Sequence, residues 1–220
     1  MTKQEPRRRL SSLRSMELSP DRQVALEGIV QACPDDRNTP WGRRKPAEVT
    51  NLLRLDQLAP PGRMVIRAID ASGALRIALA LRVKCPAVRP DGQIYVADQA
   101  ELGIILTDGC LRGAKDSVAV LVFAPALFHS NAAPPGQLPI QGLCLGDASV
   151  SMPVAALGCA ELVLLLYSIL QLQTVTIDPE DPLRVANPEA ARYWLAHRDQ
   201  MPLDRTPFLA PVEYSGGATP

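Results

Sequence analysis

The second half of the chain carries three ordered signals, and they decide how the whole sequence is interpreted. They are Phe128-His129-Ser130-Asn131, then Gly142-Leu143-Cys144-Leu145-Gly146, and then Asp178-Pro179-Glu180-Asp181-Pro182-Leu183 leading into Asn187-Pro188-Glu189-Ala190-Ala191. A cysteine thus lies among small residues, with an asparagine before it and an acidic loop after it. Glycines on both sides of the thiol let a second chain approach closely. Because thiolates are good nucleophiles and good leaving groups, this arrangement indicates acyl transfer rather than hydrolysis.

Composition points to one globular domain without a strong electrostatic partner. The 220 residues are 47% hydrophobic, which is enough for a real core. The 23 Lys and Arg residues balance the 23 Asp and Glu residues, so the chain has no net charge that would attract nucleic acid or an anionic membrane. Aromatic residues make up 4% of the chain, too few for platforms on which bases stack.

The five cysteines include no CxxC pair, so we expect no zinc site, no other metal and no cofactor. An odd number of thiols beside an ample core indicates reduced cysteines and a cytoplasmic location. The N-terminus is basic but lacks an apolar run, so it does not resemble a secretory signal. We predict a disordered basic arm over 1–19, one domain over 20–205 and a flexible tail over 206–220.

Periodicity predicts an α+β fold, with a four-stranded antiparallel meander sheet and helices packed on one of its faces. A helix over 20–33, capped by Ser19, is followed by a loop over 35–45. Arg82 to Gly92 is interpreted as a polar connection. The expected strands are Met64–Ile69, Ala74–Val83, Ala100–Thr107 and Ser117–Phe123, the last being a continuous apolar run typical of a central strand.

The most apolar stretch, residues 153–175, is predicted to form one buried helix. Its length approaches the roughly 20 residues of a membrane span. However, Glu161 in its middle would be costly in lipid, which favours a core helix. Asn187-Pro188 is typical of a helix start and predicts a final amphipathic helix.

Cys144 has two interpretations from its neighbours alone. A lone cysteine in an apolar run is most often a small buried core residue. No Lys, Arg or His lies within three residues of it, so the sequence indicates no strongly activated thiolate. The flanking signals nevertheless favour a functional thiol. The other cysteines are interpreted as structural: Cys33, Cys85, Cys110 and Cys159.

In this order the signals resemble the ubiquitin-conjugating enzyme family, especially its divergent bacterial branch from ubiquitin-like conjugation operons. Phe123–Asn131 is similar to the strand and His-Pro-Asn turn of that family, and Gly142–Leu145 matches the Gly-x-Cys-Leu context of its acceptor cysteine. Residues 153–175 resemble the long helix that follows. Glu180–Leu183 and Asn187–Ala191 match an Asp-Asp-Pro-Leu-like loop and a Pro-Glu-x-Ala helix.

The resemblance covers about residues 64–200 and implies a ubiquitin-conjugating-like fold. Cys144 would carry the C-terminal carboxyl of a ubiquitin-like modifier as a thioester and pass it to a lysine of a target protein. Asn131 would stabilise the oxyanion or the active-site loop. Asp181 would orient or deprotonate the incoming amine. His129 would pin the turn by hydrogen bonds.

The partners implied by the resemblance are an adenylating activating enzyme, the modifier, the target and often a deconjugating peptidase from the same operon. Such operons are associated with defence against phage. Two departures from the family pattern stand out. Ser130 replaces proline, and Asn131 precedes Cys144 by 144 − 131 = 13 positions, more than is usual.

Two other interpretations stay open. A cysteine peptidase would pair a thiolate with His129 or His197, although no peptidase signature surrounds Cys144. Alternatively, a catalytically weak or inactive protein of the same fold would be a binding module for a ubiquitin-like partner.

Overall fold

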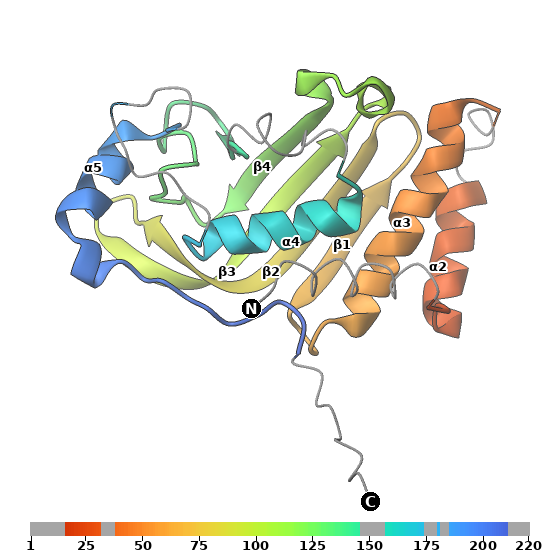
Figure 1. Cartoon of the computed structure of the whole chain (residues 1–220), viewed down its shortest axis with the longest axis horizontal. Helices are drawn as coiled ribbons and strands as arrows, with labels where there is room; N and C mark the ends of the chain where they lie inside the picture. The colour runs from red at the N-terminus through yellow and green to blue at the C-terminus, as the bar shows by residue number, and fades with distance from the viewer. Residues whose placement is uncertain (1–15, 32–37, 146–156, 174–179, 181–184, 211–220) are drawn as a thin grey trace, which may run out of the picture.

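The computed structural model describes residues 16–31, 38–145, 157–173, 180 and 185–210. It has an α+β architecture, in which helices α3 and α4 lie on the same side of an antiparallel sheet (Figure 1). Helix α2 lies outside α3, and α5 lies at the opposite end of the sheet (Figure 1). The helices are α2 (Pro20–Gln31), α3 (Pro40–Leu58), α4 (Cys159–Leu170) and α5 (Pro188–Ala196). The strands are β1 (Met64–Asp70), β2 (Leu75–Val88), β3 (Ile94–Leu106), β4 (Val118–Ala124) and β5 (Gln141–Gly142).

The sheet follows the predicted meander, with the spatial order β1-β2-β3-β4-β5. The prediction of four strands is corrected to five within the described residues. The added strand, β5, is only two residues long and pairs Gly142 with Leu121 and Gln141 with Val122 of β4. It lies just before Cys144, so the edge of the sheet supports the segment that carries the thiol.

Strand β2 continues well beyond Val83, so the polar connection predicted from Arg82 is wrong as far as Val88. Pro86 lies inside this strand, opposite Phe128 of a neighbouring segment. The Pro86 carbonyl accepts a hydrogen bond from the Phe128 N–H (3.0 Å), but a proline has no N–H with which to complete an antiparallel pair. The Phe128 carbonyl instead accepts a hydrogen bond from Nε1 of Trp194 in α5 (3.0 Å). The proline therefore leaves an acceptor by which α5 is attached to the sheet.

Helix α3 replaces part of the loop that the sequence predicted over 35–45. It begins at Pro40, and the N-cap Thr39 accepts a hydrogen bond from the Gly42 N–H (2.9 Å). Polar residues interrupt the apolar spacing at its start, and one of them, Lys45, is buried. Because this lysine occupies an inward position, where an apolar residue is expected, the sequence does not show the helical periodicity.

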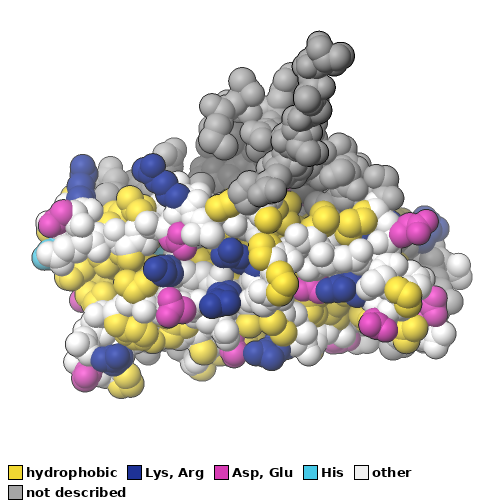
Figure 2. Space-filling model, turned by 90° about the horizontal axis from the view of Figure 1, so that it is seen from below, with side chains coloured by type: hydrophobic (Ala, Val, Ile, Leu, Met, Phe, Trp, Pro, Cys, Tyr) yellow, Lys and Arg dark blue, Asp and Glu magenta, His cyan; other side chains and the backbone are white. Residues whose placement is uncertain are grey.

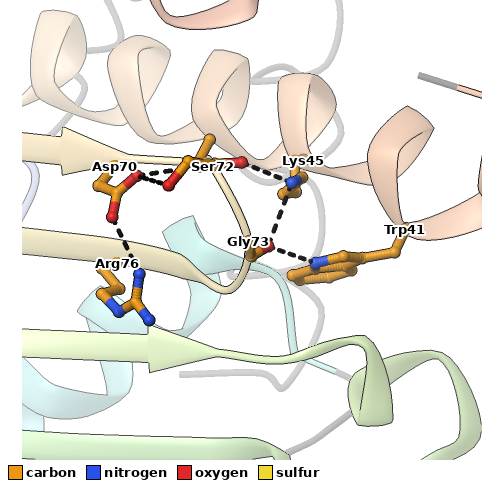
Figure 3. A network of polar contacts seen from close by, with 7 residues as sticks. Trp41, Lys45, Asp70, Ser72, Gly73 and Arg76 are labelled. Carbon is orange, nitrogen blue, oxygen red and sulfur yellow. Dashed lines mark hydrogen bonds and ion pairs between the residues drawn. The ribbon is translucent and has the colours of Figure 1, made fainter. Parts of the chain in front are cut away.

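Lys45 and Trp41 attach α3 to the turn between β1 and β2 (Figure 3). The ammonium of Lys45 donates to the carbonyls of Ala71 and Gly73, and the Trp41 indole N–H also donates to the Gly73 carbonyl (3.0 Å). On the outer side of the turn, Asp70 accepts hydrogen bonds from Ser72 and pairs with Arg76. The Ser72 bonds and Arg76 lower the pKa of Asp70 to about 2.

Helix α4 lies within the apolar stretch that the sequence predicted as one helix over 153–175, and it ends at Leu170, so the prediction is wrong for the described residues 171–173. It begins at Cys159, and a carboxylate oxygen of buried Glu48 in α3 accepts a hydrogen bond from the Cys159 N–H (2.7 Å). Arg44 pairs with the other oxygen of Glu48 (2.9 Å). A carboxylate at a helix N-terminus satisfies free N–H groups there, so Glu48 fixes the start of α4 against α3. No described helix is long and apolar enough to cross a membrane.

The chain after α5 returns across the molecule to α4. Gln171 donates to the carbonyl of Thr206 (2.9 Å), and Phe208 is buried edge-on against Tyr167. Phe208 lies in the region that the sequence assigned to a flexible tail, so packing continues past the predicted boundary at 206. On the face seen in Figure 2, basic and acidic side chains are interspersed.

Candidate functional site

Asn131 and Cys144 lie directly beside each other, although 13 positions separate them in the sequence. The Cys144 N–H donates to the Asn131 carbonyl (2.7 Å), and Nδ2 of the Asn131 side chain donates to the Cys144 carbonyl (3.1 Å). The asparagine is buried with 2% of its surface exposed, whereas Cys144 is half-buried. Of the two roles that the resemblance implied for Asn131, this contact supplies loop stabilisation, because the amide holds the backbone of the thiol residue.

His129 fixes the turn on which Asn131 sits. Its Nδ1 accepts a hydrogen bond from the Asn131 N–H (3.0 Å), so its Nε2 carries the proton that bonds the Ile169 carbonyl of α4 (2.8 Å). Burial lowers the pKa of His129 to about 4, which keeps the ring neutral near pH 7. The expectation that His129 pins the turn by hydrogen bonds is confirmed.

Ser130 joins the same turn to the start of α5. Its carbonyl accepts hydrogen bonds from the N–H groups of Ala186 (2.8 Å) and Asn187 (2.9 Å). The Asn187 side chain in turn caps α5 by accepting from the Ala190 N–H (3.0 Å), as the sequence predicted. The segment Phe128–Asn131 is thus held by α4 on one side and by α5 on the other.

The residues between Asn131 and Cys144 form an ordered excursion from the sheet. Ala132 bridges Leu143, and the Ala133 N–H donates to the Gly142 carbonyl (2.8 Å), which closes the excursion at its base. The buried side chain of Gln141 bonds the N–H and the carbonyl of Leu127 and also the carbonyl of Ala133. These bonds hold the two ends of the excursion together, so Asn131 and Cys144 are in contact although 13 positions separate them.

Gln141 is the positioning residue that the sequence analysis missed. It is buried and makes three hydrogen bonds to backbone groups on both sides of the Phe128–Asn131 segment. Its only sequence signal is a polar side chain two positions before Leu143 in an otherwise apolar run. That signal does not distinguish a buried clamp from a surface glutamine.

Cys144 differs from the other described cysteines in its exposure. Cys85, Cys110 and Cys159 are buried. Burial raises the pKa of Cys85 to about 12 and raises that of Cys159 well above its usual range, with the nearby Glu48 carboxylate adding to the effect on Cys159. A thiol must ionise to act as a nucleophile, so these two cysteines are poor candidates for chemistry. Cys33 lies outside the described residues.

The arrangement does not provide the thiolate–imidazole pair of a peptidase among the described residues. Both ring nitrogens of His129 are engaged by groups other than the thiol. His197 stacks on Tyr193 at a centroid distance of 4.3 Å, and its Nδ1 contacts the Tyr193 carbonyl (2.9 Å) at the end of α5. Asp181, the third predicted site residue, lies outside the described residues.

Comparison of the chain with protein-family models, with curated proteins and with solved structures found no match. The part of the chain that the structure describes also holds no cluster of three metal-ligating side chains. The candidate site thus consists of a half-buried thiol, an amide that holds its backbone, and a neutral histidine that accepts a hydrogen bond from the asparagine N–H.

Proposed function

We propose that the protein is a carrier of the ubiquitin-conjugating type. It accepts a ubiquitin-like modifier from an activating enzyme as a thioester on Cys144 and transfers it to an amine of a target protein, in a bacterial anti-phage conjugation pathway. The observation that carries this proposal is the pair of hydrogen bonds between Asn131 and Cys144 (2.7 and 3.1 Å). They join residues from two of the three motifs on which the resemblance depends.

The reaction has two acyl transfers, and a thiol suits both. In the first, the Cys144 thiolate attacks the carbonyl of the modifier's thioester on the activating enzyme, and the thiolate of that enzyme leaves. In the second, an uncharged amine attacks the carbonyl now bound to Cys144 and loses a proton, and the Cys144 thiolate leaves. The products are an amide and a free thiol, so neither step needs a metal, a redox partner or an imidazole base.

Each site residue has a defined part in the proposal. Asn131 is a positioning residue that holds the Cys144 backbone. Its second proposed part, stabilising the oxyanion during transfer, rests on the resemblance. Asp181 would orient or deprotonate the amine; this role rests on the match of Glu180–Leu183 to the acidic loop of the family. The half-buried position of Cys144 supports the proposal because a carrier thiol must be reached by two different proteins.

A charging reaction tests the proposal. The full-length protein is incubated with ATP and with an activating enzyme and modifier from a bacterial ubiquitin-like conjugation operon, and the products are separated with and without a reducing agent. We expect a thiol-sensitive product heavier by one modifier. Cys144→Ala abolishes it, and Cys144→Ser either yields a thiol-resistant ester or fails to charge. Cys110→Ala is the matched control, because Cys110 is buried and should not affect charging.

One result favours the binding-module alternative over the carrier. If the activating enzyme is charged with the modifier but no thiol-sensitive product forms on this protein, Cys144 is not a carrier thiol. Retained binding of the uncharged modifier, measured by calorimetry, would then assign the fold to recognition alone.

A further inference from the structure

A groove of about 520 Å³ lies beside the candidate site. Its walls come from the β2–β3 turn, from Phe128, from the excursion between Asn131 and Cys144, and from α5. Figure 1 shows α5 and the β2–β3 turn at the same end of the sheet. Segments that are far apart in the sequence therefore converge on one concave surface, as ligand sites commonly require.

Aromatic contacts hold one wall of the groove in place. Tyr193 of α5 meets Phe128 edge to face at 5.4 Å and stacks on His197 at 4.3 Å. Phe128 is itself fixed by its backbone bonds to Pro86 and to Trp194 (both 3.0 Å). A wall that is already ordered loses little conformational entropy when a ligand binds.

The two charged side chains that line the groove, Arg89 and Glu189, differ in whether they already have a partner. The guanidinium of Arg89 donates to Gln93 and lies over the Tyr95 ring at 5.0 Å, so it is already engaged. Glu189 lies in the first turn of α5, is exposed, and makes no hydrogen bond or ion pair within the described part of the chain. Arg89 and Glu189 give the groove one charge of each sign, and Glu189 is the one that lacks a partner among the described residues. A carboxylate is complementary to a cationic side chain.

The excursion between Asn131 and Cys144 supplies the remaining wall through Pro135 and Gly136. Gly136 has φ = +81°, a left-handed conformation that favours glycine. From Ser117 to Gly146 the chain has no Lys, Arg, Asp or Glu, so this wall adds apolar surface and no charge. Leu138 and Ile140 of the excursion are exposed at 58% and 42%.

The groove and the proposed thioester site are built from the same two chain segments. Phe128 lies in the groove, while Asn131, three residues later, bonds the Cys144 backbone. The excursion that forms one wall ends at Leu143, next to the thiol. A polypeptide seated in the groove would therefore be held close to the position that an attacking amine must reach.

We infer that this groove docks a segment of the acceptor protein, one that carries an aliphatic side chain and a cationic side chain. The aliphatic group lies between Tyr193 and Pro135, and the cation pairs with Glu189. The inference rests on the proposed function, because it assigns the occupant as the protein that supplies the amine. In this account the residues added between Asn131 and Cys144 give substrate selectivity to an otherwise general transfer site.

Selection from a random dodecapeptide library on the immobilised full-length protein tests the inference. Selected peptides should combine Lys or Arg with Leu, Ile or Val. Amide shifts in NMR titrations of the isotopically labelled protein with those peptides should map to Gly136, Glu189 and Tyr193. Glu189→Gln should weaken binding about fivefold, as expected for loss of one exposed ion pair. Glu189→Lys should reverse the charge preference of the selected peptides. Glu27→Gln, on the exposed surface of α2, is the matched control and should bind as wild type.

The possible failures are distinguishable. Absence of selected peptides, binding that Glu189→Gln leaves unchanged, or shifts confined to other surfaces would each overturn the groove assignment. Peptide binding does not need the thiol, so Cys144→Ser should retain it. Charging of Cys144 without peptide binding rejects the groove alone, whereas peptide binding without charging rejects the carrier and the acceptor assignment that depends on it.

Discussion

Two buried polar clusters lie at the two ends of strand β2, and they use the same interactions to different effect. At one end, Lys45 and Trp41 of α3 bind carbonyls of the β1–β2 turn. At the other, His129 and Asn131 form a turn beside Cys144. Both clusters satisfy backbone groups in the interior, where an unmet group is costly. The first cluster attaches helix α3 to the sheet, whereas the second lies next to a half-buried thiol. A turn whose backbone groups are hydrogen-bonded can therefore position a site as well as stabilise a core.

The largest effect is expected in the first cluster. Lys45→Met keeps the aliphatic stem but removes the charged hydrogen bonds to Ala71 and Gly73. At about 2 kcal/mol for each of two charged hydrogen bonds, the free energy of unfolding should fall by about 4 kcal/mol. Urea denaturation at pH 7 measures it. A loss close to zero would show that the cluster does not anchor α3, and the contrast between the two ends of β2 would then fail.

The second cluster should respond to pH where the first does not. Burial lowers the pKa of His129 from 6.5 to about 4, so folding favours the neutral ring. The stabilisation is complete above pH 6.5 and is lost as the pH falls from 6.5 toward 4, by about 3 kcal/mol in total. Asp70, whose pKa is lowered to about 2, loses its contribution only below pH 3.8 and is separable.

Urea denaturation of wild type and His129→Gln at several pH values checks this assignment. The variant should be less stable at pH 7 but should lack the slope between pH 6.5 and 4. Equal slopes in the two proteins would assign the titration to another group.

A smaller effect is expected for the clamp on the excursion. Gln141→Ala removes bonds to Leu127 and Ala133 and leaves buried backbone groups without a partner. The free energy of unfolding should fall by about 2 kcal/mol. Hydrogen exchange should show faster exchange at Leu127 and Ala133, with little change at the β1–β2 turn. Uniform acceleration across the sheet would mean that the clamp is not local.

The smallest effect is expected for the exposed ion pair on the outer side of the β1–β2 turn, in contrast to the buried lysine on its inner side. Arg76 pairs with Asp70 at 2.9 Å, but both side chains are about half exposed, at 56% and 49%. Water screens such pairs, so Arg76→Ala should lower the free energy of unfolding by about 0.5 kcal/mol or less. A loss as large as that of Lys45→Met would show that the outer side of the turn, rather than the buried lysine, fixes α3.

Most of the strands and helices could be predicted from sequence patterns, and those that were missed have physical causes. Alternation and turn residues, with a continuous apolar run for Ser117–Phe123, located four strands. Asn187-Pro188 located the start of α5. Helix α3 was missed because a buried lysine and a buried glutamate occupy inward positions, where periodicity expects apolar residues. The end of β2 was missed because proline has no N–H to donate and is therefore unusual inside a strand. Here the carbonyl of Phe128, which lies opposite Pro86, accepts from the Trp194 indole instead.

The candidate site was predictable in part. Cys144 and Asn131 were predicted from the order of the three motifs and the resemblance that they carry. The contact between them depends on Gln141 and on closure of the excursion, which only the folded chain reveals. The grouping of Glu189, Phe128 and Pro135 around one groove likewise depends on how three segments converge. The role of Asp181 stays a prediction.

The proposal that Asn131 and Cys144 act as one unit in acyl transfer rests on the two hydrogen bonds between them. Single-turnover discharge of the charged protein to free lysine tests it most directly, with wild type and Asn131→Ala compared after equal charging and Arg76→Ala, exposed at the β1–β2 turn, as the control. The account predicts that Asn131→Ala charges like wild type but discharges about 100-fold more slowly, the size typical for loss of one positioned amide donor. Equal discharge rates for the two proteins would contradict it.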